Sequence, residues 1–228
     1  MGKKIIGLDI DGVLVSGQDW LRANHRAKEA RPSANSLFDL RLVAALTEFD
    51  LEAVRGVRQV LMAHPGTKIV VTSAWVGSLG MKETMAAMLR NGFTPDDFHT
   101  DWNLPLAARR LGYDGIWQKV ADDPSYRASW PAMWLTLHPQ VNRYVVLDDQ
   151  WIGRQIVYHP KALHDPQLRK RRPWIVADDG WNGKPDGNWV HVAAQDGVDI
   201  LRPRHVQQAI RILERIPDDA QHVSRFEQ

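Results

Sequence analysis

Cysteine is absent from the 228 residues, which excludes disulfide bonds, thiolate metal sites and cysteine nucleophiles. No apolar run is long enough to span a bilayer, and Asp9 and Asp11 interrupt the first apolar stretch too early for a secretory signal. The net charge of +2 is too slight to indicate a polyanionic partner. We therefore expect a cytoplasmic protein with no membrane association and no disulfide-linked partner.

Several familiar motifs are also missing. Neither GxxxxGK[ST] nor GxGxxG occurs, so the nucleotide-binding loops of kinases and dehydrogenases are excluded. Ile6 occupies the position that the myristoylation pattern reserves for a hydroxyl residue. Histidines show no metal-ligand spacing and are expected at the surface or in caps; those considered are His25, His64, His99, His138, His159, His164 and His191.

The overall composition is that of an ordinary globular protein, with 44% apolar and 25% charged residues. The length suits one domain with a substantial insertion. We predict a single domain over residues 1–216, with insertions at 16–66 and 151–188 and a flexible tail at 217–228. Tryptophan is abundant, with ten residues, most of which are expected to pack in the core.

Apolar runs and helical periodicity alternate along the chain. Buried strands are predicted at residues 4–9, 68–72, 144–149 and 189–193. Helices are predicted at 20–30, 37–49, 51–63, 81–89, 104–111 and 204–216, with another opening at Asp123-Pro124 and kinked near Ser129 by Pro131. This alternation predicts an α/β fold with a mostly parallel sheet.

Polar side chains follow three of these strands. Asp9 and Asp11 end the first strand, Thr72 and Ser73 end the second, and the pair Asp148-Asp149 ends the third. Taken singly, Asp11 can belong to an Asp-Gly turn, Thr72 and Ser73 to a helix cap, and the Asp148-Asp149 pair to a turn. Because the carboxyl ends of parallel strands share one edge, we expect these groups to meet there.

Such an edge suits metal-assisted phosphoryl transfer. Mg²⁺ prefers carboxylate and carbonyl oxygens, and it offsets the repulsion between neighbouring acids. One carboxylate can attack phosphorus, and a second can exchange protons with the leaving oxygen and with water. Hydroxyls and one cationic side chain can hold the phosphoryl oxygens.

The motifs resemble those of the haloacid dehalogenase (HAD) superfamily of aspartate-nucleophile phosphatases. Asp9-Ile10-Asp11-Gly12-Val13 is similar to the first motif, Val70–Ser73 to the second, and Val145–Asp149 to the fourth. The resemblance implies a three-layer Rossmann-like fold with helices on both faces and small cap or loop insertions. The branch found in Swiss-army-knife RNA-repair proteins is indicated by Thr-Ser-x-Trp at 72–75, and by Arg127, Trp134-Leu135 and His138.

Carried over by position, the resemblance implies a role for each matched residue. Asp9 is the nucleophile and a Mg²⁺ ligand, and Asp11 is the acid/base, with its backbone carbonyl also touching the metal. Thr72 binds the phosphoryl group, with Ser73 as the neighbouring alternative. Asp149 is a direct metal ligand, and Asp148 acts through water or a hydrogen bond. The cation of the third motif is Arg127 or Lys119, and the distance of Arg127 from Asp148 suits the superfamily better.

Alternatives of other classes remain. A phospho-receiver module also gathers acids at strand ends, but such domains are about half this length. A catalytically idle relative would bind a partner through residues 151–188. The expected substrate is a phosphorylated small molecule, a nucleotide or a nucleic-acid phosphate end, and the last two are preferred. The run Arg169–Arg172 is more often a solvated face than a contact with phosphates.

Overall fold

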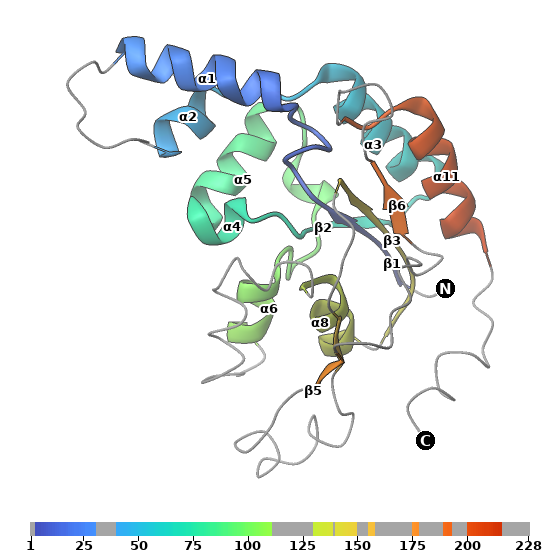
Figure 1. The fold of residues 1–228 in the computed structure, drawn as a ribbon. Coiled ribbons are helices and arrows are strands. Elements are labelled where there is room, and N and C mark those ends of the chain that lie inside the picture. Colours follow the sequence, from blue (N-terminus) through green and yellow to red (C-terminus); the bar gives the residue numbers. More distant parts are fainter. Residues whose placement is uncertain are drawn as a thin grey trace.

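The computed structural model describes residues 3–30, 40–110, 130–138, 140–149, 155–157, 175–177, 189–192 and 200–215. Its centre is a four-stranded parallel sheet flanked by helices, with the strand order β2-β1-β3-β6 (Figure 1). The strands are β1 (Lys3–Leu8), β2 (Lys68–Val71), β3 (Val141–Asp148) and β6 (Trp189–His191). The predicted α/β fold with a mainly parallel sheet is confirmed.

Strand β1 lies in the middle of the sheet between β2 and β3. Its last residue, Leu8, is in register with Val71 of β2 and Leu147 of β3, and all three side chains are buried. The strands are apolar on both faces because helices cover both faces of a parallel sheet. Since all four strands run in the same direction, the residues that follow them gather at one edge.

The helices form layers around this sheet. They are α1 (Gly17–Ala30), α2 (Leu40–Leu46), α3 (Leu51–Ala63), α4 (Trp75–Ser78), α5 (Met81–Arg90), α6 (Leu104–Arg110), α8 (Trp130–Leu137) and α11 (Pro203–Glu214), with a 3₁₀ turn η1 (Pro95–Asp97). Figure 1 shows α3 and α11 together on one side of the sheet, with α6 and α8 away from them. Helices α1 and α2 lie at the end of the sheet toward which β1 runs.

Helix α3 has the bounds that its sequence predicts. The Asp50 side chain caps it by accepting the Ala53 N–H at 2.9 Å. Val57 and Val60 recur on its buried face, and the helix ends at His64, before Pro65-Gly66. A capping acid, an apolar stripe and a Pro-Gly stop therefore define this element locally.

Other elements differ from their predictions. Helix α1 begins at Gly17, three residues before the predicted start, because Ser16 and Asp19 cap it: the Ser16 hydroxyl donates to the Asp19 carboxylate at 2.6 Å and accepts the Asp19 N–H at 3.2 Å. Helix α2 ends at Leu46, before the predicted end at Phe49, and Phe49 lies in the core instead. Helix α4 was not predicted.

Part of the predicted organisation lies outside the described residues. Of the 151–188 insertion, the structure describes β4 (Gln155–Val157) and β5 (Ile175–Ala177), which pair antiparallel as a two-stranded sheet separate from the main one. The Arg169–Arg172 run, the 217–228 tail and the kink near Ser129 are not among the described residues, and the division into one domain with two insertions stays a prediction. No helix among the described residues is long and apolar enough to cross a bilayer.

Candidate active site

Three acids meet at the carboxyl edge of the sheet. Asp9 follows β1 directly, Asp148 is the last residue of β3, and Asp149 comes next. One carboxylate oxygen from each lies within 4.8 Å of the others. Asp9 is fully buried and Asp148 is 3% exposed, so these charges are largely removed from water. The structure thus brings together three of the acids that the sequence singles out.

Backbone pairing between the strands fixes this arrangement. The Asp9 N–H donates to the Leu147 carbonyl at 3.0 Å, which continues the β1–β3 ladder to the end of both strands. The Asp148 carbonyl accepts the Val192 N–H at 2.8 Å, and His191 Nε2 lies 3.0 Å from the Asp149 carbonyl. The acids are therefore carried by the rigid centre of the sheet rather than by a loose loop.

A tight turn follows Asp9 and places Gly12 against Asp149. The Ile10 carbonyl accepts the N–H groups of Leu14 at 2.8 Å and Val15 at 3.0 Å. Gly12 has φ +70°, a conformation that side chains disfavour, and a Cβ atom there would overlap the Asp149 side chain. Glycine is required at this position for both reasons.

Thr72 and Ser73 lie at the same edge, directly after β2. The Thr72 N–H donates to the Leu8 carbonyl at 2.9 Å, so Thr72 is held beside the end of β1. Both side chains are buried, and among the described residues the Thr72 hydroxyl has no hydrogen-bond partner. A buried hydroxyl without a partner is costly in an apolar setting, which indicates a place for a polar ligand.

The side chain of Asp11 contacts Trp75 and does not belong to the three-acid group. Both of its carboxylate oxygens lie 2.9 Å from the indole Nε1 of Trp75, the first residue of α4. Its side chain is not in the group formed by Asp9, Asp148 and Asp149. The expected contact of the Asp11 carbonyl with the metal stays a prediction. The bond to Trp75 was missed by the sequence prediction, although Trp75 belongs to the Thr-Ser-x-Trp segment.

The three-acid group fits a hard divalent cation. Three carboxylates this close repel one another, and burial strengthens that repulsion because the local dielectric is low. Carboxylate oxygens are the ligands that Mg²⁺ favours, and one from each of Asp9, Asp148 and Asp149 is already gathered. The predicted cations Arg127 and Lys119 lie outside the described residues.

A second cluster contradicts the expectation that the histidines lie at the surface or in caps. His138 is 2% exposed, with Nε2 2.8 Å from Asp101 Oδ2 and Nδ1 2.8 Å from the Trp134 carbonyl. Both partners are acceptors, so only the doubly protonated ring satisfies both bonds. Arg110 also pairs with both oxygens of Asp101. His99 completes a group whose ligand atoms lie within 4.8 Å of one another.

Asp101 is the electrostatic centre of this second cluster. Burial opposes the ionisation of Asp101, but hydrogen bonds from Arg110 and His138 hold the pKa of its carboxyl below the usual range. Burial and the nearby His138 lower the pKa of His99. With both oxygens of Asp101 bound to Arg110, whose side chain is about half exposed, the arrangement is that of a partly buried ion-pair network rather than an open metal site.

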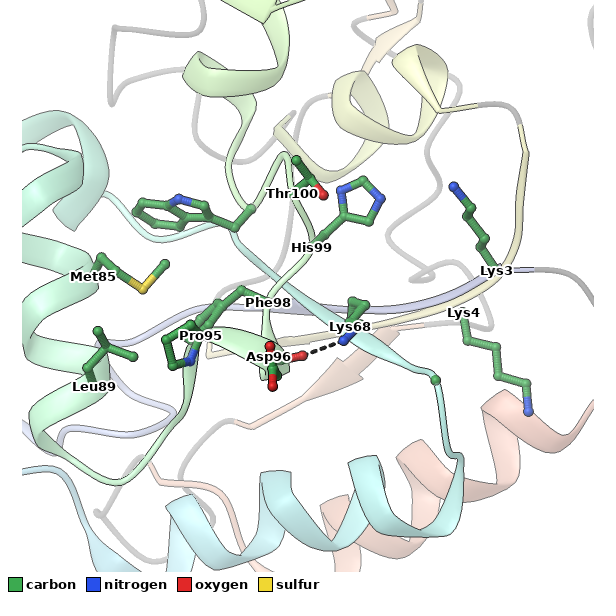
Figure 2. A pocket seen from close by; sticks show the side chains of 12 residues that line it. Lys3, Lys4, Lys68, Met85, Leu89, Pro95, Asp96, Phe98, His99 and Thr100 are labelled. Carbon is green, nitrogen blue, oxygen red and sulfur yellow. Dashed lines mark hydrogen bonds between the residues drawn. The ribbon is translucent and has the colours of Figure 1, made fainter.

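A pocket of about 650 Å³ lies at the opposite end of the strands from the acids. Lys3, Lys4 and Lys68 come from the first residues of β1 and β2, and Met85 and Leu89 of α5 face them across the pocket (Figure 2). Its lining has a single carboxylate, Asp96, and so lacks the acid pair that phosphoryl transfer to a carboxylate needs. The three-acid edge is therefore the better candidate for chemistry.

Comparisons with known proteins place this geometry in a family. A search of curated proteins and a search of solved structures each found no significant match. The family model described as the HAD domain in Swiss Army Knife RNA repair proteins matches residues 5–175, which is most of the chain and includes all three strand ends described above. HAD domains of this kind are hydrolases that generally use Mg²⁺. The chain therefore belongs to the family of HAD domains found in Swiss Army Knife RNA repair proteins.

Proposed function

We propose that this chain is a Mg²⁺-dependent phosphatase that hydrolyses phosphoric monoesters through an aspartyl-phosphate on Asp9. The observation that carries the proposal is the group of Asp9, Asp148 and Asp149, of which the first two are buried, at the edge where the Thr72 hydroxyl also lies. A second acid two residues after the nucleophile supports phosphatase chemistry over dehalogenation, because a halide leaving group needs no proton.

The reaction has two balanced steps. In the first, an Asp9 oxygen attacks phosphorus, the bond from phosphorus to the leaving oxygen breaks, and Asp11 gives that oxygen a proton. In the second, water attacks the same phosphorus and the bond to Asp9 breaks. The proton from water passes to Asp11, and inorganic phosphate leaves. Asp9 and Asp11 thus return to their starting states.

The remaining residues hold the phosphoryl group and the metal. Thr72 donates its hydroxyl to a phosphoryl oxygen, with Ser73 as the neighbouring donor, and Arg127 or Lys119 supplies the positive charge. Asp9, Asp148 and Asp149 hold Mg²⁺, which neutralises negative charge on the phosphoryl oxygens when it is bound. Asp9 is therefore both nucleophile and ligand, so the attacking oxygen is kept beside the bound phosphoryl group.

The proposed substrate is a nucleotide or the phosphorylated end of a nucleic acid. The description of the matched family, which names RNA repair proteins, supports this class. The basic run Arg169–Arg172 in the 151–188 insertion supports it too, because such runs contact phosphate backbones in nucleic-acid-binding proteins.

A phosphatase assay with Mg²⁺ tests the proposal. The wild type, Asp9→Asn and the exposed control Asp96→Asn are assayed on p-nitrophenyl phosphate, sugar phosphates, nucleotides, and 3′- and 5′-phosphorylated oligonucleotides. We expect Asp9→Asn to lose activity by at least about 10⁴-fold, since it removes the nucleophile. Asp96→Asn should match the wild type.

Trapping the phosphoryl group separates this function from its alternatives. In a rapid acid quench with labelled substrate, Asp11→Asn should retain label on the protein, because its second step lacks a base, and Asp9→Asn should retain none. Full activity in Asp9→Asn would overturn the proposal. A stable adduct on the wild type without turnover would instead indicate a phospho-receiver, and no reaction with any monoester would indicate an idle relative.

A further inference from the structure

Trp75 connects the proposed acid/base, Asp11, to helix α1. Its indole Nε1–H donates to the Asp11 carboxylate, with 2.9 Å to each oxygen. Its ring contacts Trp20 of α1, at 5.8 Å between ring centroids, and Phe49, at 6.0 Å. Trp75 is only 3% exposed, so its indole ring is shielded from water.

The backbone around Trp75 is fixed by the residues that precede it. The Trp75 N–H lies 3.4 Å from the Ser73 hydroxyl oxygen, and the Val76 N–H donates to the Ser73 carbonyl at 3.2 Å. The start of α4 therefore follows Thr72 and Ser73 in one short turn. An indole mounted on this turn joins the end of β2 to the turn that follows β1.

We propose that Trp75 positions the Asp11 carboxylate for proton transfer, and that α1 stabilises this position through Trp20. The inference rests on the proposed function, because Asp11 needs positioning only if it exchanges protons with a substrate. The indole Nε1–H of Trp75 lies at equal distance from both Asp11 oxygens, so it fixes the direction in which the carboxylate faces. Misplacement of a reacting group by about 1 Å can slow a reaction by about 100-fold.

The choice of leaving group makes this role measurable. An alkyl phosphate such as glycerol phosphate needs a proton on its leaving oxygen, whereas the p-nitrophenolate of p-nitrophenyl phosphate departs without one. Trp75→Phe keeps an aromatic ring beside Trp20 and Phe49 but removes the N–H. In the first turnover, we expect leaving-group release to slow by about 10- to 100-fold for the alkyl ester and by less than about 3-fold for the aryl ester.

Two variants separate positioning from a general loss of stability. Trp134→Phe is the matched control, because Trp134 is also buried and its indole N–H donates to the Asp101 carbonyl at 2.6 Å. We expect Trp134→Phe to lower the unfolding free energy without changing the ratio of the alkyl to the aryl rate. Trp20→Ala keeps the Trp75 N–H but removes the packing from α1, so this ratio should fall by an intermediate factor.

Equal slowing of both esters in Trp75→Phe would overturn the inference, as would the same change of ratio in Trp134→Phe. An unchanged ratio in Trp20→Ala would overturn the part assigned to α1. Each outcome assumes that the wild type hydrolyses both esters, so a further measurement is needed that does not depend on turnover.

Nuclear magnetic resonance of the indole N–H supplies this measurement. The Trp75 signal is identified by its loss in Trp75→Phe, and we expect it to move when Asp11→Asn replaces the carboxylate with an amide. A signal that does not move overturns the inference whatever the activity. If Asp11→Asn moves the signal but the wild type has no phosphatase activity, the proposed function fails, while the bond between Trp75 and Asp11 stands.

Discussion

The backbone of Gly12 lies directly against the side chain of Asp149, leaving no room for a Cβ atom between them. The turn that follows β1 is thereby pressed onto the acid that follows β3. Two segments that are more than 130 residues apart in the sequence meet at this contact. The geometry of the three-acid group depends on this close approach.

Gly12→Ala should therefore impair both folding and metal binding. A side chain at φ +70° costs about 1–3 kcal/mol, and the new methyl group must also displace Asp149. We expect a lower unfolding free energy and a smaller stabilisation by Mg²⁺, measured by denaturant unfolding with and without the ion. Gly17→Ala is the control, because nothing lies near a Cβ at Gly17. Wild-type response to Mg²⁺ in Gly12→Ala would contradict this account.

Mg²⁺ should stabilise the wild type much more than Asp149→Asn, a variant that keeps only two of the three clustered carboxylates. At a concentration 100-fold above its dissociation constant, a ligand of the folded state adds about 2.7 kcal/mol to the unfolding free energy. Asp149→Asn removes one of three mutually repelling carboxylates, so we expect it to raise the unfolding free energy without Mg²⁺ and to lose most of the gain with it. Thermal melts over a Mg²⁺ titration measure both effects. Equal stabilisation of the two proteins would show that the ion binds elsewhere.

Much of the fold was predictable because its signals are local. Helix α3 was predicted with the correct bounds, because Asp50, the apolar stripe and Pro65-Gly66 all lie within one short segment. The strands were predicted from apolar runs, and the meeting of Asp9 with Asp148 and Asp149 follows from the parallel direction of β1 and β3. The common direction of the parallel strands was sufficient to predict that these acids meet at one edge.

What was missed depends on contacts between distant segments. Helix α4 has only four residues, and Trp75 at its start is held by Asp11 and Trp20, neither of which is near it in the sequence. The pairing of His138 with Asp101 spans 37 residues and follows no helical or strand period. Such pairs leave no pattern in a single sequence, so a buried histidine cannot be told from a surface histidine.

Asp101 should be critical for stability, because it pairs with both Arg110 and the buried His138. Asp101→Asn leaves the buried His138 without its anionic partner, and breaking a buried pair in this way costs about 3–5 kcal/mol. The exposed Asp96→Asn should be neutral. Urea unfolding near neutral pH measures the difference, and a loss below about 1 kcal/mol would show that the network contributes little.

The same network predicts a dependence of stability on acid. The pKa of Asp101 is lower in the folded protein than in the unfolded chain, so its contribution is fully present above the unfolded value, which is about 4. That contribution is lost as the pH falls below this value and through the folded pKa. Asp101→Asn, which does not titrate, should therefore lose less unfolding free energy than the wild type between about pH 4 and pH 2. Parallel curves for the two proteins would contradict the assignment.

His205 should control stability at milder pH. It lies in the first turn of α11, is 5% exposed, and accepts the Arg202 N–H on Nδ1 at 3.0 Å, which requires an unprotonated nitrogen there. Burial, and then the nearby Arg204, His191 and Arg202, lower the pKa of His205 to about 4. In the unfolded chain His205 has an ordinary pKa of 6.5. Between pH 6.5 and 4, His205 is therefore protonated in the unfolded chain but not in the folded protein.

The unfolding free energy of the wild type should accordingly fall as the pH drops from 6.5 to 4, by up to about 3 kcal/mol from this residue. His205→Gln supplies the control, because glutamine at this helix position can accept the same backbone N–H without titrating. Its unfolding free energy should change less over that interval, while the two proteins remain similar above pH 6.5. Urea unfolding at closely spaced pH values checks this, and an equal slope in His205→Gln would assign the acid sensitivity to other groups.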